Sequence, residues 1–268
     1  MHQKLKIVVL AKQVPDTRNV GKNAMKEDGT VNRAALPAIF NPEDMNALEQ
    51  ALRIKEQYRD VTVELLTMGP GRAADIIREG LFRGADGGIL LTDRKFAGAD
   101  TLATSYALAQ ALRKMQPDIV IAGRQAIDGD TAQVGPQVAE KLNWPQVTYT
   151  EEIVGIKEGT ITVKRRLEHG IEIVSAPLPL LITVHGSAAP CRPRHAKRLL
   201  KYKRAQITEW SVADVNGDEQ QYGLMGSPTK VKKIENIVFQ AKESKRLSAS
   251  DLEINDLIRE LIINHTIG

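Results

Sequence analysis

Four short apolar runs, each followed by a turn and then by apolar residues at helical spacing, constrain the fold of this chain most strongly. The expected strands cover 6–10, 61–67, 88–92 and 119–122. A helix start is marked by Asn41 and Pro42, an N-cap followed by proline at the first helical position. Repeated strand and helix units build a parallel sheet, because each helix crosses the sheet face before the next strand. The sequence therefore predicts an α/β fold with a doubly wound, mostly parallel sheet.

The pattern changes after Pro145 to alternating apolar and polar residues, with turns at 157–160 and 168–170. This alternation predicts an appended antiparallel meander over about 146–176. The apolar run 178–184 is expected to return into the main sheet as a buried strand. Residues 1–206 are then one α/β domain, which includes a loop at about 185–204. Residues 207–268 are expected to form an extended C-terminal arm, whose last helix docks on the chain's own body or on a partner.

The expected strand at 119–122 runs into an acidic turn with glycine that opens a helix. Asp130 stands at the expected N-cap, with Gln133 three residues later to complete a capping box. The amides of 131–133 would then point out of the helix end, where they and the helix dipole attract phosphate. Gly129 would permit close backbone approach. The segment is either a nucleotide site or ordinary α/β architecture.

Two further features lie at the same expected edge of the sheet. Residues 69–74 satisfy the pattern G-x-G-x-x-A, and Asp93 lies near the next strand end. Pro70 removes one amide from this loop. A nucleotide-facing loop is therefore preferred over a strict dinucleotide fingerprint, and an ordinary turn is the alternative. Arg124 is either a cation beside a phosphate or a solvated surface arginine.

Composition excludes several classes of protein. The only cysteine is Cys191, so the chain holds no internal disulfide framework and no iron–sulfur cluster of its own. No run approaches the roughly 18 apolar residues of a membrane span, and no signal-peptide pattern is present, so a cytoplasmic location is expected. There is no P-loop, GxSxG, HExxH or Cys/His metal spacing. We therefore expect no catalytic side chains and no metal site, but a carrier of a bound cofactor.

A basic run between 192 and 204 contains seven Lys and Arg residues. A docking loop for an acidic partner is the preferred interpretation, followed by a solvated helix face. A nucleic-acid site ranks last, because Tyr202 is the only aromatic residue within the run. The residues expected to dock the partner are Arg192, Arg194, Arg198, Leu199, Leu200 and Lys201.

The chain resembles the beta subunit of electron transfer flavoproteins. The resemblance rests on the segments KIVVLAKQVPDT, FNPEDMNALEQALRIKE, LTMGPG, AGRQAIDGDTAQVGPQVAEKLNWPQ and GLMGSPTKV, which extend over nearly the whole chain. It implies an alpha-subunit partner and an adenine nucleotide in this subunit. In one subgroup that nucleotide is structural AMP. In the electron-bifurcating subgroup it is FAD, NADH is the electron donor, and the electrons pass to ferredoxin and to the alpha-subunit FAD.

The segments VPDT and GRQAIDGDTAQVGP resemble the bifurcating subgroup, so we expect FAD, with AMP as the alternative. The resemblance also implies a recognition loop at about 185–204, where the family's leucine anchor aligns with Ala196, and a flavin-dependent dehydrogenase or reductase as a further partner. The isoalloxazine ring is expected near 14–17 and Arg124. The cofactor-binding residues expected together from the residue patterns and the resemblance are Leu10, Val14, Pro15, Asp16, Thr17, Asn41, Pro42, Glu43, Asp44, Met68, Gly69, Arg124, Asp128, Gly129, Asp130, Thr131, Ala132, Gln133, Val134, Gly135, Pro136, Gln137, Val138 and Ala139.

Overall fold

The computed structural model describes residues 4–16, 37–229, 246–248, 250–264 and 266–267 of the chain. Within these residues one nine-stranded sheet has the order β11-β5-β4-β1-β6-β10-β7-β8-β9, and a small second sheet pairs β2 with β3. The strands are β1 (Leu5–Leu10), β2 (Gln13–Pro15), β3 (Ala38–Phe40), β4 (Val61–Met68), β5 (Gly87–Leu91), β6 (Ile119–Gly123), β7 (Gln146–Lys157), β8 (Thr160–Leu167), β9 (Gly170–Pro177), β10 (Leu180–Val184) and β11 (Thr208–Trp210).

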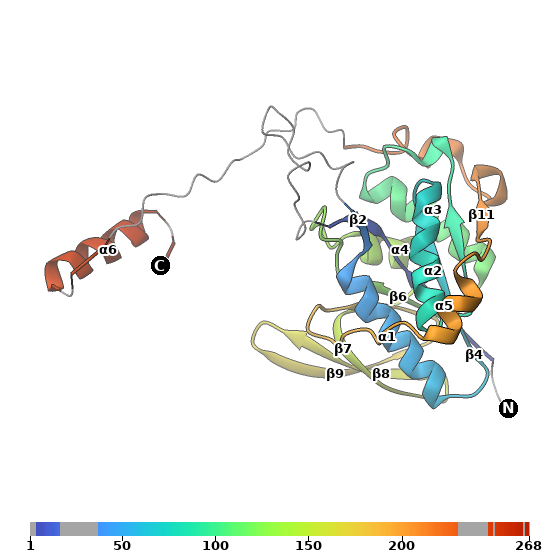
Figure 1. Ribbon diagram of the computed structural model, residues 1–268, viewed down its shortest axis with the longest axis horizontal. Helices are drawn as coiled ribbons and strands as arrows, with labels where there is room; N and C mark the ends of the chain where they lie inside the picture. Colours follow the sequence, from blue (N-terminus) through green and yellow to red (C-terminus); the bar gives the residue numbers. More distant parts are fainter. Residues whose placement is uncertain (1–3, 17–36, 230–245, 249, 265, 268) are drawn as a thin grey trace.

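Helices cover both faces of the parallel part of this sheet (Figure 1). The α-helices are α1 (Pro42–Gln57), α2 (Ala74–Arg83), α3 (Thr101–Met115), α4 (Val134–Leu142), α5 (Ala196–Tyr202) and α6 (Asp251–Ile263). Short 3₁₀ turns are η2 (Gly71–Ala73), η3 (Arg94–Phe96), η4 (Val212–Asp214) and η5 (Glu219–Gln221). Helices α1 and α2 bury one face of the sheet and α3 and α4 bury the other, while α5 packs against α2.

Strand β1 shows why the apolar runs of the sequence are continuous. Ile7 and Val9 point into the core under α1 and α2, whereas Val8 and Leu10 point into the core under α3 and α4. Successive side chains of a strand point to opposite faces, so a strand covered on both sides needs apolar residues at every position. The predicted α/β class and mostly parallel sheet are confirmed.

The antiparallel extension is present as β7, β8 and β9. Its first strand, β7, is twelve residues long, and its pairing with β8 shifts register twice. Strand β10 returns to the main sheet between β6 and β7, as expected, and is completely buried.

The C-terminal arm begins later than expected. Strand β11 pairs with β5, and Val212, Val215 and Tyr222 are buried in the core under α3. Residues 208–229 are therefore part of the α/β body. The sequence pattern did not indicate this, because short exposed strands such as β11 carry little apolar signal. Helix α6 buries none of its residues and lies apart from the body (Figure 1). Its docking on a partner stays a prediction.

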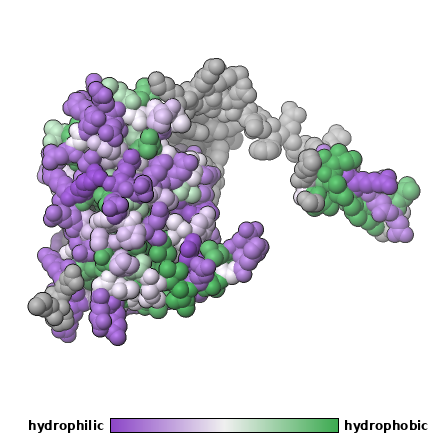
Figure 2. Space-filling view, turned by 180° about the vertical axis from the view of Figure 1, so that it is seen from behind, coloured by the Kyte–Doolittle hydropathy of each residue, from purple (hydrophilic) through white to green (hydrophobic). Residues whose placement is uncertain are grey.

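Apolar side chains of α6 gather on one side of the helix, which appears green beside a purple polar side (Figure 2). They include Leu252, which is 76% exposed, and Ile263, which is 75% exposed. Among the described residues, no helix combines the length and the apolar character that crossing a membrane requires.

Candidate functional site

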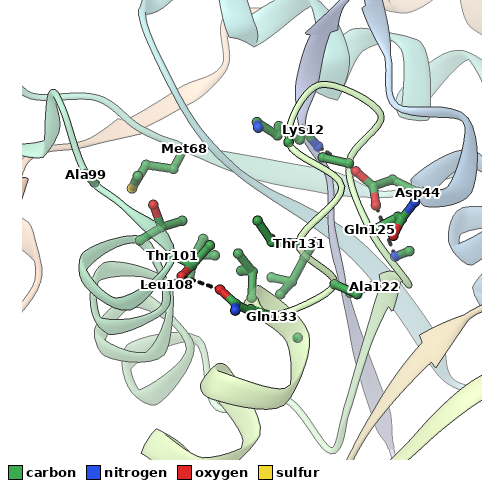
Figure 3. Close-up of a pocket in the computed structure, with 18 of the residues that line it drawn as sticks. Lys12, Asp44, Met68, Ala99, Thr101, Leu108, Ala122, Gln125, Thr131 and Gln133 are labelled. Atoms are coloured by element: carbon green, nitrogen blue, oxygen red, sulfur yellow. Dashed lines mark hydrogen bonds between the residues drawn. The ribbon is translucent and has the colours of Figure 1, made fainter. Parts of the chain in front are cut away.

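A cavity of about 450 Å³ lies at the carboxyl ends of β1, β4 and β6. Its wall is completed by the loop before α3, the turn after β6 and the first turn of α4 (Figure 3). This edge of a parallel sheet is where open α/β folds bind ligands. The volume falls in the range of small-molecule sites, roughly 300–1,000 Å³.

The turn after β6 differs from the expected capped helix start. Helix α4 begins at Val134, and its N-cap residue Gln133 makes no side-chain capping bond. Asp130 and Ala132 have left-handed backbones, with φ of 48° and 52°. Asp130 instead accepts a hydrogen bond from Gln125 Nε2 at 2.8 Å. The assignment of Asp130 as a helix cap is therefore wrong, because the left-handed residues Asp130 and Ala132 precede the true N-cap, Gln133.

The N-terminal end of α4 is open toward the cavity. The first amides of a helix have no partner within the helix, and no side chain in the described part of the chain is found to cap those of α4. Gln133 is engaged elsewhere, since its Oε1 accepts a hydrogen bond from Thr101 Oγ1 at 2.9 Å (Figure 3). Val134 and Gly135 line the cavity. An uncapped helix end with its positive dipole is a place where phosphate binds favourably.

The start of α1 holds the turn after β6 in place. Asn41 is completely buried, and its side chain donates to Gln125 O at 2.9 Å and accepts from Ile127 N at 3.2 Å. Glu43 accepts hydrogen bonds from Gln125 N at 2.9 Å and from Arg124 Nη2 at 3.2 Å. Neither Asn41 nor Glu43 lines the cavity. These side chains therefore act on the turn in this structure, rather than on the contents of the cavity.

Asp44 joins two strand ends beneath the cavity. Its carboxylate oxygens accept from Lys12 N at 2.9 Å and from Gly123 N at 3.0 Å. Burial raises the pKa of Asp44 to about 7, although hydrogen bonds from Lys12, Asn41 and Gly123 oppose that rise. A side chain at Gly123 would collide with Asp44, because a Cβ there would lie 2.4 Å from Asp44 Oδ1. The close approach of α1 to β6 therefore depends on glycine at this position.

Two cations border the cavity. Lys12 Nζ lies 2.7 Å from Asp128 Oδ1, in a pair that joins the end of β1 to the turn after β6. Arg124 pairs with Glu43, and its Nε is buried without a hydrogen-bond partner in the described part of the chain. Each cation is partly neutralised by its carboxylate partner, so the open helix end and the unsatisfied donor of Arg124 are the features that suit an anionic ligand.

The structure brings part of the predicted cofactor set to one cavity. Those that line it are Leu10, Asp44, Met68, Arg124, Gly129, Asp130, Thr131, Ala132, Gln133, Val134 and Gly135. Those that do not line it are Val14, Pro15, Asp16, Asn41, Pro42, Glu43, Gly69, Asp128, Pro136, Gln137, Val138 and Ala139. Thr17 lies outside the described residues. Binding by any of these residues stays a prediction.

Local structure explains several residues that do not line the cavity. Val14 lies in β2, which pairs with β3, and its side chain is 1% exposed. Val138 and Ala139 form the buried face of α4 against the sheet. Met68 lines the cavity, but none of residues 69–74 does. The expectation that the glycine loop faces the nucleotide cavity is therefore not met. Asp93 caps η3 through Lys95 N instead of facing a ligand.

Sequence reasoning missed one wall of the cavity, formed by Phe96, 98–101, Thr104 and Leu108. A usable signal was present at Asp100, whose side chain caps α3 by accepting from the amides of Leu102 and Ala103. Strand β5 ends at Leu91, shortly before this cap, so the cap lies at the same carboxyl edge of the sheet as the cavity.

The basic segment at 192–204 is more firmly attached than a free docking loop. Arg192 pairs with Glu49 at 2.9 Å and also with Glu56, and Arg194 pairs with Glu79 at 2.6 Å. Arg198 donates to the carbonyls of Leu81 and Ala85. The exposed members of the predicted docking set include Leu200, which is 79% exposed, and Lys201. The arginines hold the segment to the body, and docking by the segment stays a prediction.

Comparison with known proteins agrees with this architecture. The family model described as the electron transfer flavoprotein domain matches residues 28–215. The chain belongs to the electron transfer flavoprotein family. It is 43% identical to the electron transfer flavoprotein subunit beta of Megasphaera elsdenii, over 97% of this chain and 100% of that protein. The resemblance to beta subunits that the sequence motifs indicated is thereby confirmed.

Two other relatives carry names of complexes. The chain is 43% identical to the caffeyl-CoA reductase-Etf complex subunit CarD of Acetobacterium woodii, over 85% of this chain and 86% of that protein. It is 40% identical to the acryloyl-CoA reductase electron transfer subunit gamma of Anaerotignum propionicum, over 98% of this chain and 100% of that protein. Each of these similarities extends over most of both chains.

Proposed function

We propose that this chain is the beta subunit of a cytoplasmic, electron-bifurcating electron transfer flavoprotein, with FAD in the cavity at the end of β6. In this proposal the alpha subunit completes a heterodimer, NADH donates electrons, and the electrons divide between ferredoxin and a flavin-dependent dehydrogenase or reductase. The FAD supplies the redox chemistry when it is bound. The protein's part is to bind it, position it and set its electrostatic surroundings.

The observation that carries the proposal is the open N-terminal end of α4 at the cavity. The helix starts at Val134, its N-cap residue Gln133 makes no side-chain capping bond, and Gly135 lets this first turn pack closely against Thr183 of β10. Lys12 and Arg124 also line the cavity, each paired with a carboxylate, and Arg124 keeps one donor without a partner among the described residues. Together these groups suit the phosphates of an adenine nucleotide.

The residues of the chain have separate tasks in this proposal. The amides of α4 bind phosphate, and Met68, Phe96 and Leu108 provide apolar surface for the adenosine part. Asn41 and Glu43 keep the turn after β6 in the shape that binds the nucleotide. None of these side chains needs to donate or accept a proton.

FAD is preferred over AMP for two reasons. The segments VPDT and GRQAIDGDTAQVGP resemble the bifurcating subgroup. Relatives at 40–43% identity are named for acyl-CoA reductase complexes with their own electron transfer subunits. A non-bifurcating beta subunit that holds structural AMP is the second candidate, because AMP presents the same adenosine and first phosphate to the helix end.

The test is the cofactor content of the purified heterodimer of this chain with its alpha subunit. We expect two FAD per heterodimer after denaturation and chromatography, with no AMP. One FAD together with one AMP would refute the bifurcating assignment and favour the second candidate. Absence of any adenine nucleotide beyond the alpha-subunit FAD would refute the cavity as a cofactor site.

A further inference from the structure

The segment 223–229 packs against the loop that forms one wall of the cavity, although it does not line the cavity itself. Gly223 has φ of +54°, and a Cβ there would lie 2.1 Å from Lys95 O. Leu224 N donates to Ala97 O at 3.1 Å. The two backbones touch, so the position of the segment and the position of the wall are linked.

Asp100 is the centre of this contact. Besides capping α3 with Oδ1, it accepts with Oδ2 from Thr229 Oγ1 at 2.7 Å and from Thr229 N at 3.1 Å. Its own amide donates to Ser227 Oγ at 2.9 Å, and this buried hydroxyl donates to Gly223 O at 2.6 Å. One carboxylate therefore holds the start of α3 and the segment 223–229 at once.

The charge state of Asp100 agrees with that role. Burial opposes its ionisation, but hydrogen bonds from Ala103 and from Thr229 hold the pKa of Asp100 below its ordinary value. An ionised carboxylate makes stronger hydrogen bonds than a neutral acceptor does.

A further hydrogen bond continues from Asp100 to the open end of α4. The next residue, Thr101, donates through Oγ1 to Gln133 Oε1 at 2.9 Å, across the cavity wall (Figure 3). Gln133 immediately precedes α4. Thr229, Asp100, Thr101 and Gln133 thus form a continuous series of contacts from the surface to the helix end that faces the cavity.

We propose that Thr229 is a positioning residue for the nucleotide cavity, which acts through Asp100 on the starts of α3 and α4. The inference rests on the proposed function, and it adds regulation of that same site. The segment 223–229 is partly exposed at the surface, so a partner that contacts it also acts on the cavity wall. Binding of the alpha subunit through this segment and binding of nucleotide are then coupled, and such coupling is reciprocal.

The test uses the αβ complex after removal of the nucleotide of this subunit, with AMP as the titrated probe. Thr229→Val removes the hydroxyl and keeps the shape of the side chain, and Thr229→Ser restores the hydroxyl. The matched control is Thr208→Val, because Thr208 is also exposed and no side-chain hydrogen bond of it is found among the described residues.

We expect Thr229→Val to weaken AMP binding about fivefold, which corresponds to about 1 kcal/mol, the size of one net hydrogen bond. Thr229→Ser and Thr208→Val should bind within about twofold of wild type. Wild-type affinity in Thr229→Val would overturn the inference, and so would an equal loss in Thr229→Ser. If the wild-type complex binds neither AMP nor FAD, the proposed function itself fails, which distinguishes the two outcomes.

A second measurement tests the route through Thr101. If the contacts act in series, Thr101→Val and Thr229→Val together should weaken AMP binding little more than the larger single effect. Independent effects would multiply instead. Strict multiplication of the two losses would overturn the route, while melting temperatures of the nucleotide-free complexes identify any variant that is merely unfolded.

Discussion

Gly135 offers the most direct structural test of the cavity, because the first turn of α4 approaches the sheet only without a side chain there. A Cβ at position 135 would lie 2.7 Å from Thr183 Cγ2 and 3.7 Å from Leu181 Cδ2. Thr183 is 1% exposed and belongs to the central strand β10, so it has no room to move. Gly135→Ala must therefore push the open end of α4 away from the sheet.

Overpacking of this kind costs about 1–3 kcal/mol. For a chain of this size, each kcal/mol lowers the melting temperature by about 2–4 °C, so we expect a fall of roughly 2–12 °C. The displaced helix end should also bind AMP and FAD more weakly. Differential scanning calorimetry and isothermal titration of the αβ complex measure the two effects.

Two further variants make this prediction specific. Gly71→Ala is the control, since a Cβ at Gly71 meets no atom within 4 Å and the residue does not line the cavity. Thr183→Ser removes the colliding methyl group but keeps the hydroxyl that accepts from Tyr149 N. The double variant Gly135→Ala with Thr183→Ser should recover most of the lost stability and affinity. A Gly135→Ala complex that melts and binds like wild type would refute the packing argument, and failure of the rescue would refute its cause.

Asp44→Asn should change the pH dependence of stability. The pKa of Asp44 is raised from 3.8 in the unfolded chain to about 7 in the folded protein. The stability that the protonated carboxyl contributes is therefore fully present below pH 3.8 and is lost as pH rises through 7. The wild-type urea midpoint should therefore fall relative to the variant between pH 4 and 8, and a constant difference would contradict the assignment. Arg192→Ala should cost about 1–3 kcal/mol, because the buried carboxylate of Glu49 loses its hydrogen bonds from the Arg192 guanidinium and keeps only Arg53 and the amide of residue 192. Lys201→Ala should leave the melting temperature unchanged and slow only electron delivery to the partner. Lys12→Met should change stability by no more than about 1 kcal/mol, since its ion pair is largely exposed, but should weaken FAD binding in a salt-dependent way that the distant control Lys6→Met does not share.

Much of the fold follows from patterns that depend on local burial. The strands of the parallel sheet are covered on both faces, so they appear as unbroken apolar runs, and Pro42 marks the start of α1 within one residue. Strand β11 escaped notice because it has three residues that are mostly exposed, and its place is decided by pairing with β5.

The site was less predictable because its shape depends on contacts distant in sequence. The pattern at Asp130 resembled a helix cap, yet the left-handed residues Asp130 and Ala132 delay the helix to Val134. The earlier part of the same turn, at Gln125 and Ile127, is held by Asn41, more than 80 residues away in the chain. Similarly, the sequence pattern assigned Arg192 to docking, because it could not reveal that Arg192 pairs with Glu49, which lies 143 residues earlier.

The central claim is that the open end of α4 holds the phosphates of FAD, and a crystal structure of the αβ complex purified with its natural cofactors tests it most directly. The account predicts FAD in the cavity of this subunit, with a phosphate accepting hydrogen bonds from the amides of Val134 and Gly135. AMP in the same place would contradict the bifurcating assignment. An empty cavity, or an adenine nucleotide bound to this chain elsewhere, would contradict the account as a whole.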